Sequence, residues 1–435
     1  MARARRDRLV APVAVVLRAA SVGLAVPVAY LTVLTAVAWG ATAVRWRRPR
    51  ASTAAAGRAR RRFAVLVPAH DEAQVIAETL GALQRVEYPD DRYEVHVLAD
   101  HCSDGTAAIA RSLGACVHEI DGELRGKGPA LAGAIARLTD PELVSDDDPL
   151  GAIVVVDADT IVAPGFLLAL DAAFEAGADA VQGHYRVLEP GGSTGAALRA
   201  AALASRHHLR PLARTTLGAS SGLYGNGMAF TPRLLAGRKW SNHLTEDIEL
   251  QQELLLDGTC VAYAPDAVVE AAMPATLEGA TTQNERWERG RIELARRYVP
   301  RLVRRAVTRR GRERVAAVDG VLDHVTPPMS VLVAAVGVVG AAGAGVALVR
   351  GRRLRGSLVL PAAVTVHVLS GLILDEAPRS VYRSLLHAPS MVLWKVRLWG
   401  RMLVRRGEMD WVRTARPGDA ATGSSAHPEQ LEVTT

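Results

Sequence analysis

Three long apolar runs near the two ends of this chain enclose a region of shorter, alternating apolar and polar segments. The first run covers residues 21–44 and follows a basic segment at residues 1–20. The others cover residues 327–349 and 357–374. A helix needs about 20 apolar residues to cross a bilayer, so we expect three transmembrane helices. The last two form a hairpin, for which an interfacial or re-entrant placement stays open.

The arginines around the first run indicate its orientation. Four arginines lie within residues 1–8 and eight within residues 45–62. By the positive-inside rule, the following domain then faces the cytoplasm at the cell membrane. A cleaved signal peptide fits less well, because the run is too long and ends without a small-residue cleavage site. If both helices of the hairpin cross the membrane, the arginine-rich linker at residues 350–356 lies on the outer side, which conflicts with the positive-inside rule.

The segments beside the C-terminal apolar runs differ in composition. Residues 301–326 predict an interfacial linker. Residues 377–413 place Trp394 and Trp399 among arginines and Lys395, a pattern typical of an amphipathic helix at a membrane interface. Residues 417–435 are rich in Gly, Ser, Ala and Pro, so we expect a disordered tail.

The central region, residues 61–300, alternates short apolar segments with amphipathic ones. The pattern predicts strands at residues 63–67, 93–99, 115–120 and 152–156, and helices at residues 73–85, 104–113 and 129–138. Strands that alternate with helices form a largely parallel sheet with helices on both faces. The predicted fold class is therefore α/β, with flanking transmembrane and interfacial helices.

Candidate site residues, all but one of them carboxylates, lie at the ends of three of these strands. They are Pro68, Asp71 and Glu72 after the first, Asp100 at the end of the second, and Asp157 and Asp159 after the fourth. Ligands of α/β sheets bind at this end of the strands. Buried carboxylates need a cation there, and a divalent metal that holds a diphosphate is the natural one. The alternative for the last pair is two solvated aspartates that open a turn.

Two other polar motifs have ambiguous readings. Lys127 stands between two glycines, but the residues around it do not form a phosphate-binding P-loop. A lysine at such a turn can still contact a phosphate, and a solvated lysine is an equal alternative. His207 and His208 have no further metal-ligand residues nearby in the sequence, which favours a pair on a helix surface.

Acidic residues also open a predicted helix in the second half of the central region. Thr245 is placed to cap this helix, and Glu246 and Asp247 follow in its first turn. Acidic residues in a first turn often only compensate the helix dipole. Taken alone, this segment therefore does not establish a catalytic site.

A later helical segment combines an amide, a guanidinium and an indole. Gln283, Arg286 and Trp287 stand at i, i+3 and i+4, so they share one helix face. Arginine binds phosphate oxygens in a fork, and an indole offers an apolar platform for a sugar ring. The alternative is an interfacial tryptophan with a snorkelling arginine, because a membrane helix follows.

Five of these motifs, taken in order, resemble the signature of membrane-bound family 2 glycosyltransferases. They are the three strand-end motifs, the segment from Thr245 to Asp247 and the segment from Gln283 to Trp287. That group includes cellulose, chitin and hyaluronan synthases and bacterial exopolysaccharide glycosyltransferases. The resemblance covers about residues 61–300, and residues 411–416 resemble a closing motif of bacterial relatives. It implies a GT-A fold, which is Rossmann-like with a mainly parallel sheet. It also implies a hexosyltransferase-like enzyme that transfers a sugar from a nucleotide sugar with inversion.

The resemblance also implies roles for individual residues. Pro68, Asp71, Glu72 and Asp100 would line the nucleoside pocket, with Asp100 near the base, and Asp157 would lie near the ribose or diphosphate. Asp159 would hold Mg²⁺ or Mn²⁺. Asp247 would be the general base, oriented by Glu246. Gln283, Arg286 and Trp287 would secure the diphosphate and the acceptor sugar. Asp71 stands directly before Glu72, where the family more often has asparagine, which leaves the base-binding role of Asp71 open.

Charge and cysteine content exclude other classes. The net charge is +7, but the arginines cluster beside apolar runs and few aromatics interleave with them. That pattern suits anionic lipids better than nucleic acid. Three cysteines, Cys102, Cys116 and Cys260, are too few and too scattered to predict a disulfide framework or a zinc site.

The expected activity is therefore polysaccharide or oligosaccharide synthesis from a nucleotide-sugar donor, with a UDP-sugar as the first choice. The acceptor would be a saccharide or a lipid-linked molecule. Three membrane helices leave little to line an export channel, so an export partner is a possible addition. The alternatives are a single-sugar transferase acting on a lipid acceptor and a non-catalytic nucleotide-binding subunit of a polysaccharide complex.

Overall fold

The computed structural model describes residues 2–47, 61–140, 142, 149–238, 240–241, 245–272, 281–351 and 354–404. The predicted closing motif at residues 411–416 and the predicted tail at 417–435 lie outside these ranges. So does the end of the predicted interfacial segment, residues 405–413.

Eight strands form one mixed, mainly parallel sheet in the order β3-β2-β1-β4-β7-β6-β8-β5. The strands are β1 Phe63–Ala69, β2 Tyr93–Asp100, β3 Cys116–Ile120, β4 Ala152–Val155, β5 Thr160–Val162, β6 Ala180–Val187, β7 Met228–Phe230 and β8 Ala262–Ala271. The first four strands run parallel, and β7 is antiparallel to both of its neighbours. The four strands predicted from the sequence are thus confirmed, with slightly different ends.

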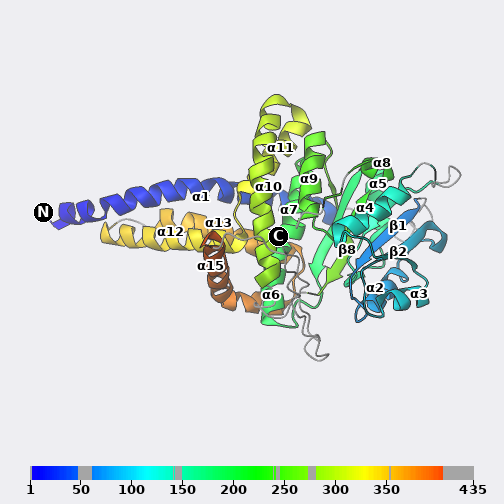
Figure 1. Cartoon of the computed structure of the whole chain (residues 1–435). Helices are drawn as coiled ribbons and strands as arrows, with labels where there is room; N and C mark the ends of the chain where they lie inside the picture. The colour runs from blue at the N-terminus through cyan, green and yellow to red at the C-terminus, as the bar shows by residue number, and fades with distance from the viewer. Residues whose placement is uncertain are drawn as a thin grey trace, which may run out of the picture.

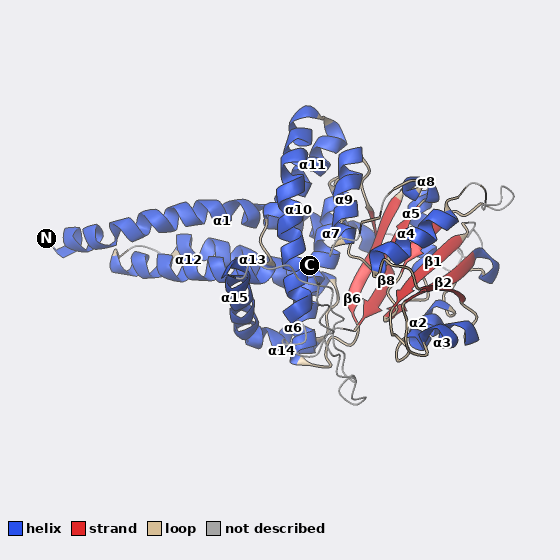
Figure 2. Ribbon diagram, in the orientation of Figure 1, coloured by secondary structure: helices blue, strands red, loops and turns tan. Residues whose placement is uncertain are grey.

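Helices cover both faces of this sheet (Figure 2). Those of the α/β domain are α2 Ile76–Leu83, α3 Thr106–Ser112, α4 Lys127–Leu138, α5 Phe166–Glu175, α6 Thr194–Ala204, α7 Arg210–Thr216, α8 Pro232–Leu235 and α9 Glu246–Asp257. A π-helix, Ser205–Leu209, joins α6 to α7, and a 3-10 turn, Asp90–Arg92, precedes β2. The predicted helix at 129–138 begins two residues earlier, which places Lys127 in its first turn.

The core lies on both sides of the central strands. Val65 of β1 belongs to the cluster that includes Phe166 of α5, whereas the next residue, Leu66, belongs to the cluster with Leu131 of α4 and Leu254 of α9. Successive side chains of a strand point to opposite faces. A strand buried on both faces is therefore apolar at every position, as the sequence of β1 is.

Long helices project from the α/β domain on the side away from β1 and β2 (Figure 1). They are α1 Ala2–Trp46, α12 Met329–Val349 and α13 Arg355–Leu374, and all three contain segments long and apolar enough to cross a membrane. All three contact one another. Thr35 of α1 lies in hydrogen-bond contact with His367 Nδ1 of α13 at 2.8 Å, which connects α1 to the hairpin of α12 and α13.

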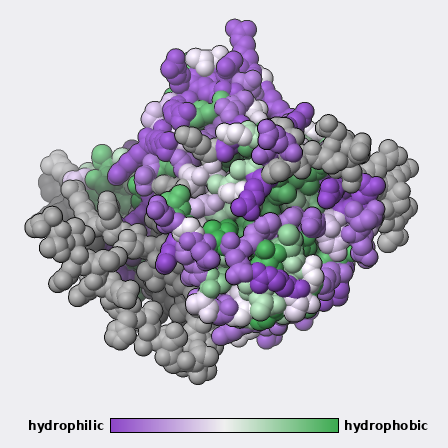
Figure 3. Space-filling view, turned by 45° about the vertical axis from the view of Figure 1, so that its right-hand side comes forward, coloured by the Kyte–Doolittle hydropathy of each residue, from purple (hydrophilic) through white to green (hydrophobic). Residues whose placement is uncertain are grey.

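Further helices join these spans to the sheet. They are α10 Thr281–Thr308, α11 Gly311–Val325, α14 Arg379–Ser384, a 3-10 turn Leu385–His387 and α15 Ala388–Val404. The helix α13 also packs directly on the π-helix, since a Cβ on Gly371 would lie 2.9 Å from the Ser205 Cα. The face of the α/β end seen in Figure 3 is mostly hydrophilic, with apolar patches near its centre.

Candidate active site

The order of the strands creates a crevice beside β1. From β1 the chain passes to β2 and β3 on one side, and then to β4 on the other. Ligands bind at such a reversal, outside the carboxyl ends of the strands. Two residues just beyond β1 and β2, Asp71 and His101, adopt left-handed backbone conformations with φ of 52° and 50°. Such conformations are uncommon for residues other than glycine and often mark functional turns.

Loop contacts hold the first two motifs together. Asp71 Oδ1 accepts hydrogen bonds from the backbone N–H of Ser103 at 2.7 Å and of Asp104 at 3.2 Å. The Glu72 N–H donates to Thr106 Oγ1 at 2.8 Å. The turn after β1 and the loop after β2 therefore form one unit, as their predicted common role requires. Asp71 holds this unit through its side chain.

Asp100 is buried and connects β2 to the loop before α4. Its Oδ2 accepts the Gly126 N–H at 2.7 Å, and its Oδ1 lies 2.7 Å from His101 Nδ1. Gly126 has a φ of 113°, a conformation that favours glycine. The bond to Asp100 thus fixes the backbone immediately before Lys127.

Lys127 connects several segments beside this reversal of the strand order. Its Nζ donates to Asp157 Oδ1 at 2.5 Å and to the Gly225 carbonyl oxygen at 2.6 Å. Burial acts to lower the pKa of Lys127, but Asp157 and Glu246 outweigh it, so the pKa lies above its usual value. The ammonium is therefore charged. The solvated alternative considered for this lysine is wrong.

The segment after β4 brings further polar groups to the same place. The Asp157 N–H donates to Asn226 Oδ1 at 3.2 Å, and Asn226 Nδ2 donates to Thr160 Oγ1 at 2.7 Å. Tyr185 of β6 lies beside both aspartates. Burial raises its pKa first, and the charges of Asp157 and Asp159 raise it further. Asp157 and Asp159 are both half-buried, and Lys127 offsets part of the negative charge of Asp157.

Asp247 lies across from Lys127, at the beginning of α9. Thr245 occupies the N-cap position, as the sequence predicts, but its side chain does not make the capping hydrogen bond. Burial raises the pKa of Asp247 to about 7, and Glu246 adds to this, whereas the Ile248 N–H, Lys127 and Arg206 oppose it. A Cβ on Gly225 would lie 3.4 Å from Asp247 Oδ2 and 3.6 Å from Lys127 Nζ. Both distances are ordinary van der Waals contacts, so it is the φ of 78° at this position that favours glycine.

The helix α10 packs against the beginning of α9 through a glycine. A Cβ on Gly290 would lie 2.6 Å from Thr245 Oγ1 and 2.9 Å from Thr245 Cγ2. The motif at residues 283–287 therefore lies on a helix that touches the segment of Asp247. The side chains of Gln283 and Arg286 are outside the described part of the structure. Trp287 is 39% exposed.

Arginines that the sequence analysis did not single out line a cavity behind Asp247. Ile248 and Gln251 of α9 form one wall. The basic lining residues are Arg206, Arg210, Arg214 and Arg291. Three of them stand at i, i+4 and i+8, a spacing that places them on one helix face and could have revealed them. Arg214 Nε donates to Asp319 Oδ2 at 2.7 Å, and Arg210 pairs with Asp323.

The prediction of a surface pair for His207 and His208 is wrong. The His207 ring stacks on Tyr224 and on Tyr185, with centroids 4.3 and 5.1 Å apart. The His208 ring stacks on His184 at 4.3 Å. Burial lowers the pKa of His207 well below its usual value, so both rings belong to the packed wall of the domain.

Comparison with known proteins identifies the class. The sequence model of the family described as "Glycosyltransferase like family 2" matches residues 60–290, more than half of the chain. The chain therefore belongs to this family and is a glycosyltransferase with a GT-A-like α/β domain. Over 52 residues it is 42% identical to probable glycosyltransferase YdaM of Bacillus subtilis (strain 168). That match covers 12% of this chain and 12% of the relative.

Several solved structures are similar to this chain. The mannosyltransferase PcManGT from Pyrobaculum calidifontis, in complex with GDP-Man and Mn²⁺, is 21% identical, with a TM-score of 0.44 over 81% of this chain and 98% of that one. A second structure is glucosyl-3-phosphoglycerate synthase from Mycobacterium tuberculosis in complex with Mn²⁺, UDP and phosphoglyceric acid. It is 24% identical, with a TM-score of 0.38, and the match covers 54% of this chain and 78% of that one. A third is TarS 1–349 of S. aureus in complex with UDP-GlcNAc. It is 15% identical, with a TM-score of 0.40, and the match covers 72% of this chain and 90% of that one.

Proposed function

We propose that this chain is a metal-dependent, inverting glycosyltransferase that adds hexose units to a saccharide or lipid-linked acceptor at the cytoplasmic face of the membrane. The observation that carries the proposal is the convergence of Lys127, Asp157 and Asp247 at the crevice beside β1. A cation, a strand-end carboxylate and a half-buried carboxyl group of raised pKa come from three different segments. Such perturbed groups in a crevice are typical of a catalytic site.

The oxygen ligands at the end of β4 fit a hard divalent cation. Asp159 follows Asp157 by two residues, and the pKa of Tyr185 rises from the charge of both. Carboxylate oxygens are the ligands that Mg²⁺ and Mn²⁺ prefer. When bound, the cation would stabilise the charge that develops on the departing diphosphate. We assign Asp159 as its principal protein ligand.

The nucleotide would occupy the crevice between the first two motifs and Lys127. Pro68, Asp71, Glu72 and Asp100 border its nucleoside end, and the Asp71 and Asp100 bonds keep these loops in position. Lys127 would exchange part of its contact with Asp157 for a diphosphate oxygen. Arg286 would reach the diphosphate from α10. A UDP-sugar is our proposed donor.

Asp247 would accept the proton of the acceptor hydroxyl. A sugar hydroxyl is a weak nucleophile until a carboxylate takes its proton in the transition state. A pKa of about 7 suits this task, because the group is then partly ionised near neutral pH and still basic enough to accept a proton. Glu246 orients Asp247 and raises its pKa. Gln283 and Trp287 would hold the acceptor sugar.

The acceptor distinguishes two versions of the activity. The motif on α10 favours repeated addition, which yields an oligosaccharide or polysaccharide. The arginine-lined cavity beside Ile248 favours an anionic acceptor such as a lipid phosphate, to which a single sugar is added. Three candidate membrane helices suit either a lipid acceptor or a polymer released through a partner. Separating the products by size after incubation with one donor distinguishes them.

The test uses the purified full-length protein in lipid nanodiscs. Thermal-shift screening with Mn²⁺ should show stabilisation by UDP and by at least one UDP-sugar, and that donor should then be turned over only when divalent metal is present. Stabilisation by GDP compounds alone would overturn the donor assignment. Binding without any turnover by well-folded protein would instead support a non-catalytic nucleotide-binding subunit.

A further inference from the structure

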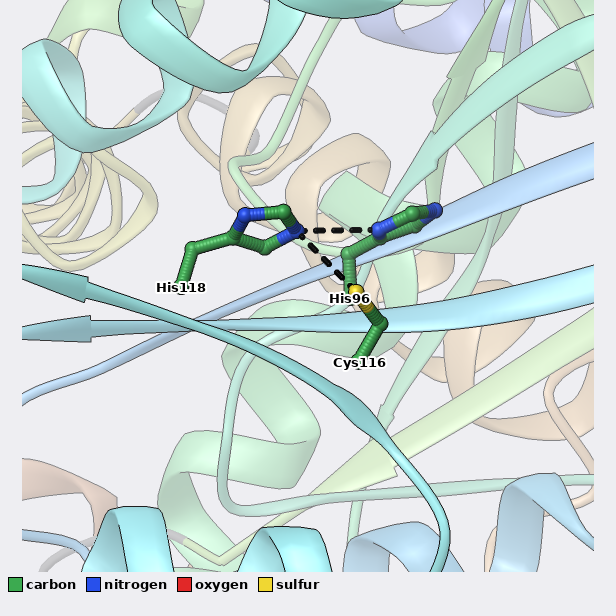
Figure 4. Close-up of side chains that lie close together, drawn as sticks. All are labelled: His96, Cys116 and His118. Atoms are coloured by element: carbon green, nitrogen blue, oxygen red, sulfur yellow. Dashed lines mark hydrogen bonds between the residues drawn. The ribbon is translucent and has the colours of Figure 1, made fainter.

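Three metal-ligating side chains meet on one face of the sheet, away from the strand ends that carry the active site. His96 lies on β2 and is aligned with Cys116 of β3, the strand at the sheet edge. His118 lies two residues after Cys116, and residues two apart on a strand share a face. Figure 4 shows the two rings and the sulfur converging on one point.

The distances between these side chains match those of a metal site. His96 Nδ1 lies 3.1 Å from His118 Nε2, and Cys116 Sγ lies 3.6 Å from the same nitrogen. In a tetrahedral zinc site, bonds of about 2.0–2.1 Å to nitrogen and about 2.3 Å to sulfur place neighbouring ligand atoms about 3.3–3.6 Å apart. The side chains would therefore need to move by only about a few tenths of an ångström to bind the ion.

We propose that His96, Cys116 and His118 bind Zn²⁺, with water at the fourth position. Glu94 completes the arrangement from the same face of β2. Its Oε2 lies 3.5 Å from His96 Nε2, which is the ring nitrogen that does not face His118. A carboxylate in this position orients a ligating imidazole and increases its basicity.

The chemistry of the ligands separates this site from the proposed catalytic metal. Imidazole and thiolate favour zinc, whereas the carboxylates near Asp159 favour Mg²⁺ or Mn²⁺. His96 precedes Asp100 by four residues, a distance of about 13 Å along a strand. The ion would thus act structurally rather than in the transfer reaction.

The position of the site indicates what it would stabilise. The edge strand β3 has only five residues, and among the described strands it pairs with β2 alone. Its last residue, Ile120, accepts the His101 N–H at 2.9 Å and leads into the loop that ends at Lys127. A metal ion bound to both β2 and β3 would stabilise this edge of the sheet. It would also stabilise the start of the loop that runs from Ile120 to Lys127.

Cobalt is the probe for the test. Full-length protein is stripped of metal with a chelator and titrated with Co²⁺, and we expect one equivalent to produce a thiolate-to-cobalt charge-transfer band that Zn²⁺ abolishes. Cys116→Ser should remove the band, and Glu94→Gln should weaken binding about 10- to 100-fold. Cys260→Ser and Asp159→Ala should leave the band unchanged, since neither residue belongs to the site.

A second measurement needs no variant and guards against misfolding. Zn²⁺ should slow alkylation of Cys116 in the wild-type protein at least about tenfold, relative to Cys260 in the same sample, because a metal-bound thiolate reacts slowly. Mass spectrometry of the two peptides reports both rates. Absence of the charge-transfer band, together with unchanged alkylation of Cys116, would overturn the proposal. The three side chains would then only hydrogen-bond to one another.

Discussion

Lys127 Nζ lies 2.5 Å from Asp157 Oδ1, and this contact joins the beginning of α4 to the end of β4. The same nitrogen donates to the Gly225 carbonyl oxygen, so one side chain links three segments that are far apart in the sequence. A cation held in this way is in position before the donor arrives. Its later contact with the diphosphate then requires little reorganisation.

The first prediction concerns donor binding by this lysine. Lys127→Met should weaken donor binding about 10- to 100-fold, because a hydrogen bond to a charged group contributes about 1.5–3 kcal/mol. Arg125→Met is the matched control, since Arg125 is an exposed cation two residues away and should have little effect. Isothermal titration with the donor measures both. An equal loss of donor affinity in the two variants would mean that Lys127 has no specific role in donor binding.

The second prediction concerns pH. The pKa of Asp247 is raised to about 7 by burial and by the charge of Glu246, so kcat/KM should fall on the acid side as Asp247 becomes protonated. Glu246→Gln removes a negative charge and lowers this pKa, which should move the acid limb to lower pH. Profiles of kcat/KM against pH measure the shift. A limb that stays in place or moves upward contradicts the assignment.

The third prediction concerns the contact between α9 and α10. Gly290→Ala would place a Cβ 2.6 Å from Thr245 Oγ1, and the beginning of α9 must then move. Because a misplacement of 1 Å can cost about a hundredfold in rate, we expect kcat to fall by up to that factor while donor affinity is kept. Gly133→Ala on α4 is the control, since its Cβ would meet nothing within 4 Å.

The fourth prediction concerns a buried ion pair between α10 and α15. Lys395 Nζ lies 2.9 Å from Glu288 Oε1, and the two side chains are only 8% and 10% exposed. Lys395→Met leaves the carboxylate without this partner and should cost about 3–5 kcal/mol of unfolding free energy. Adding Glu288→Gln should recover part of it. Thermal unfolding in detergent, run as a double-mutant cycle, separates the pair from its surroundings.

The fold and the strand-end residues could be predicted from the sequence because both follow from local patterns. Apolar runs such as residues 153–156 form buried strands, and the carboxylates after them must then lie at one edge of the sheet. The N-cap position of Thr245 was predictable for the same reason. Element ends were less accurate, as the earlier start of α4 shows.

Contacts that depend on tertiary packing could not be predicted. Nothing local to Lys127 indicates that Asp157 and Gly225 will lie beside it. The His207 ring is buried by aromatic residues of two other segments. Cys116 looks isolated until the register of β2 and β3 aligns it with His96. The cavity arginines could be predicted in part. Their helical spacing is visible in the sequence, but their acidic partners, Asp319 and Asp323, are not.

The most direct test measures sugar transfer by purified protein across a Mn²⁺ titration, for the wild type, Asp159→Ala, Asp247→Asn and the control Asp257→Asn. Asp257 lies at the other end of α9 and pairs with Arg238 on the surface. We predict metal-dependent transfer by the wild type and the control, no metal response in Asp159→Ala, and a loss of about 10²–10⁴ in kcat for Asp247→Asn. Metal-independent turnover at an equal rate, or wild-type transfer by Asp247→Asn, would contradict the account.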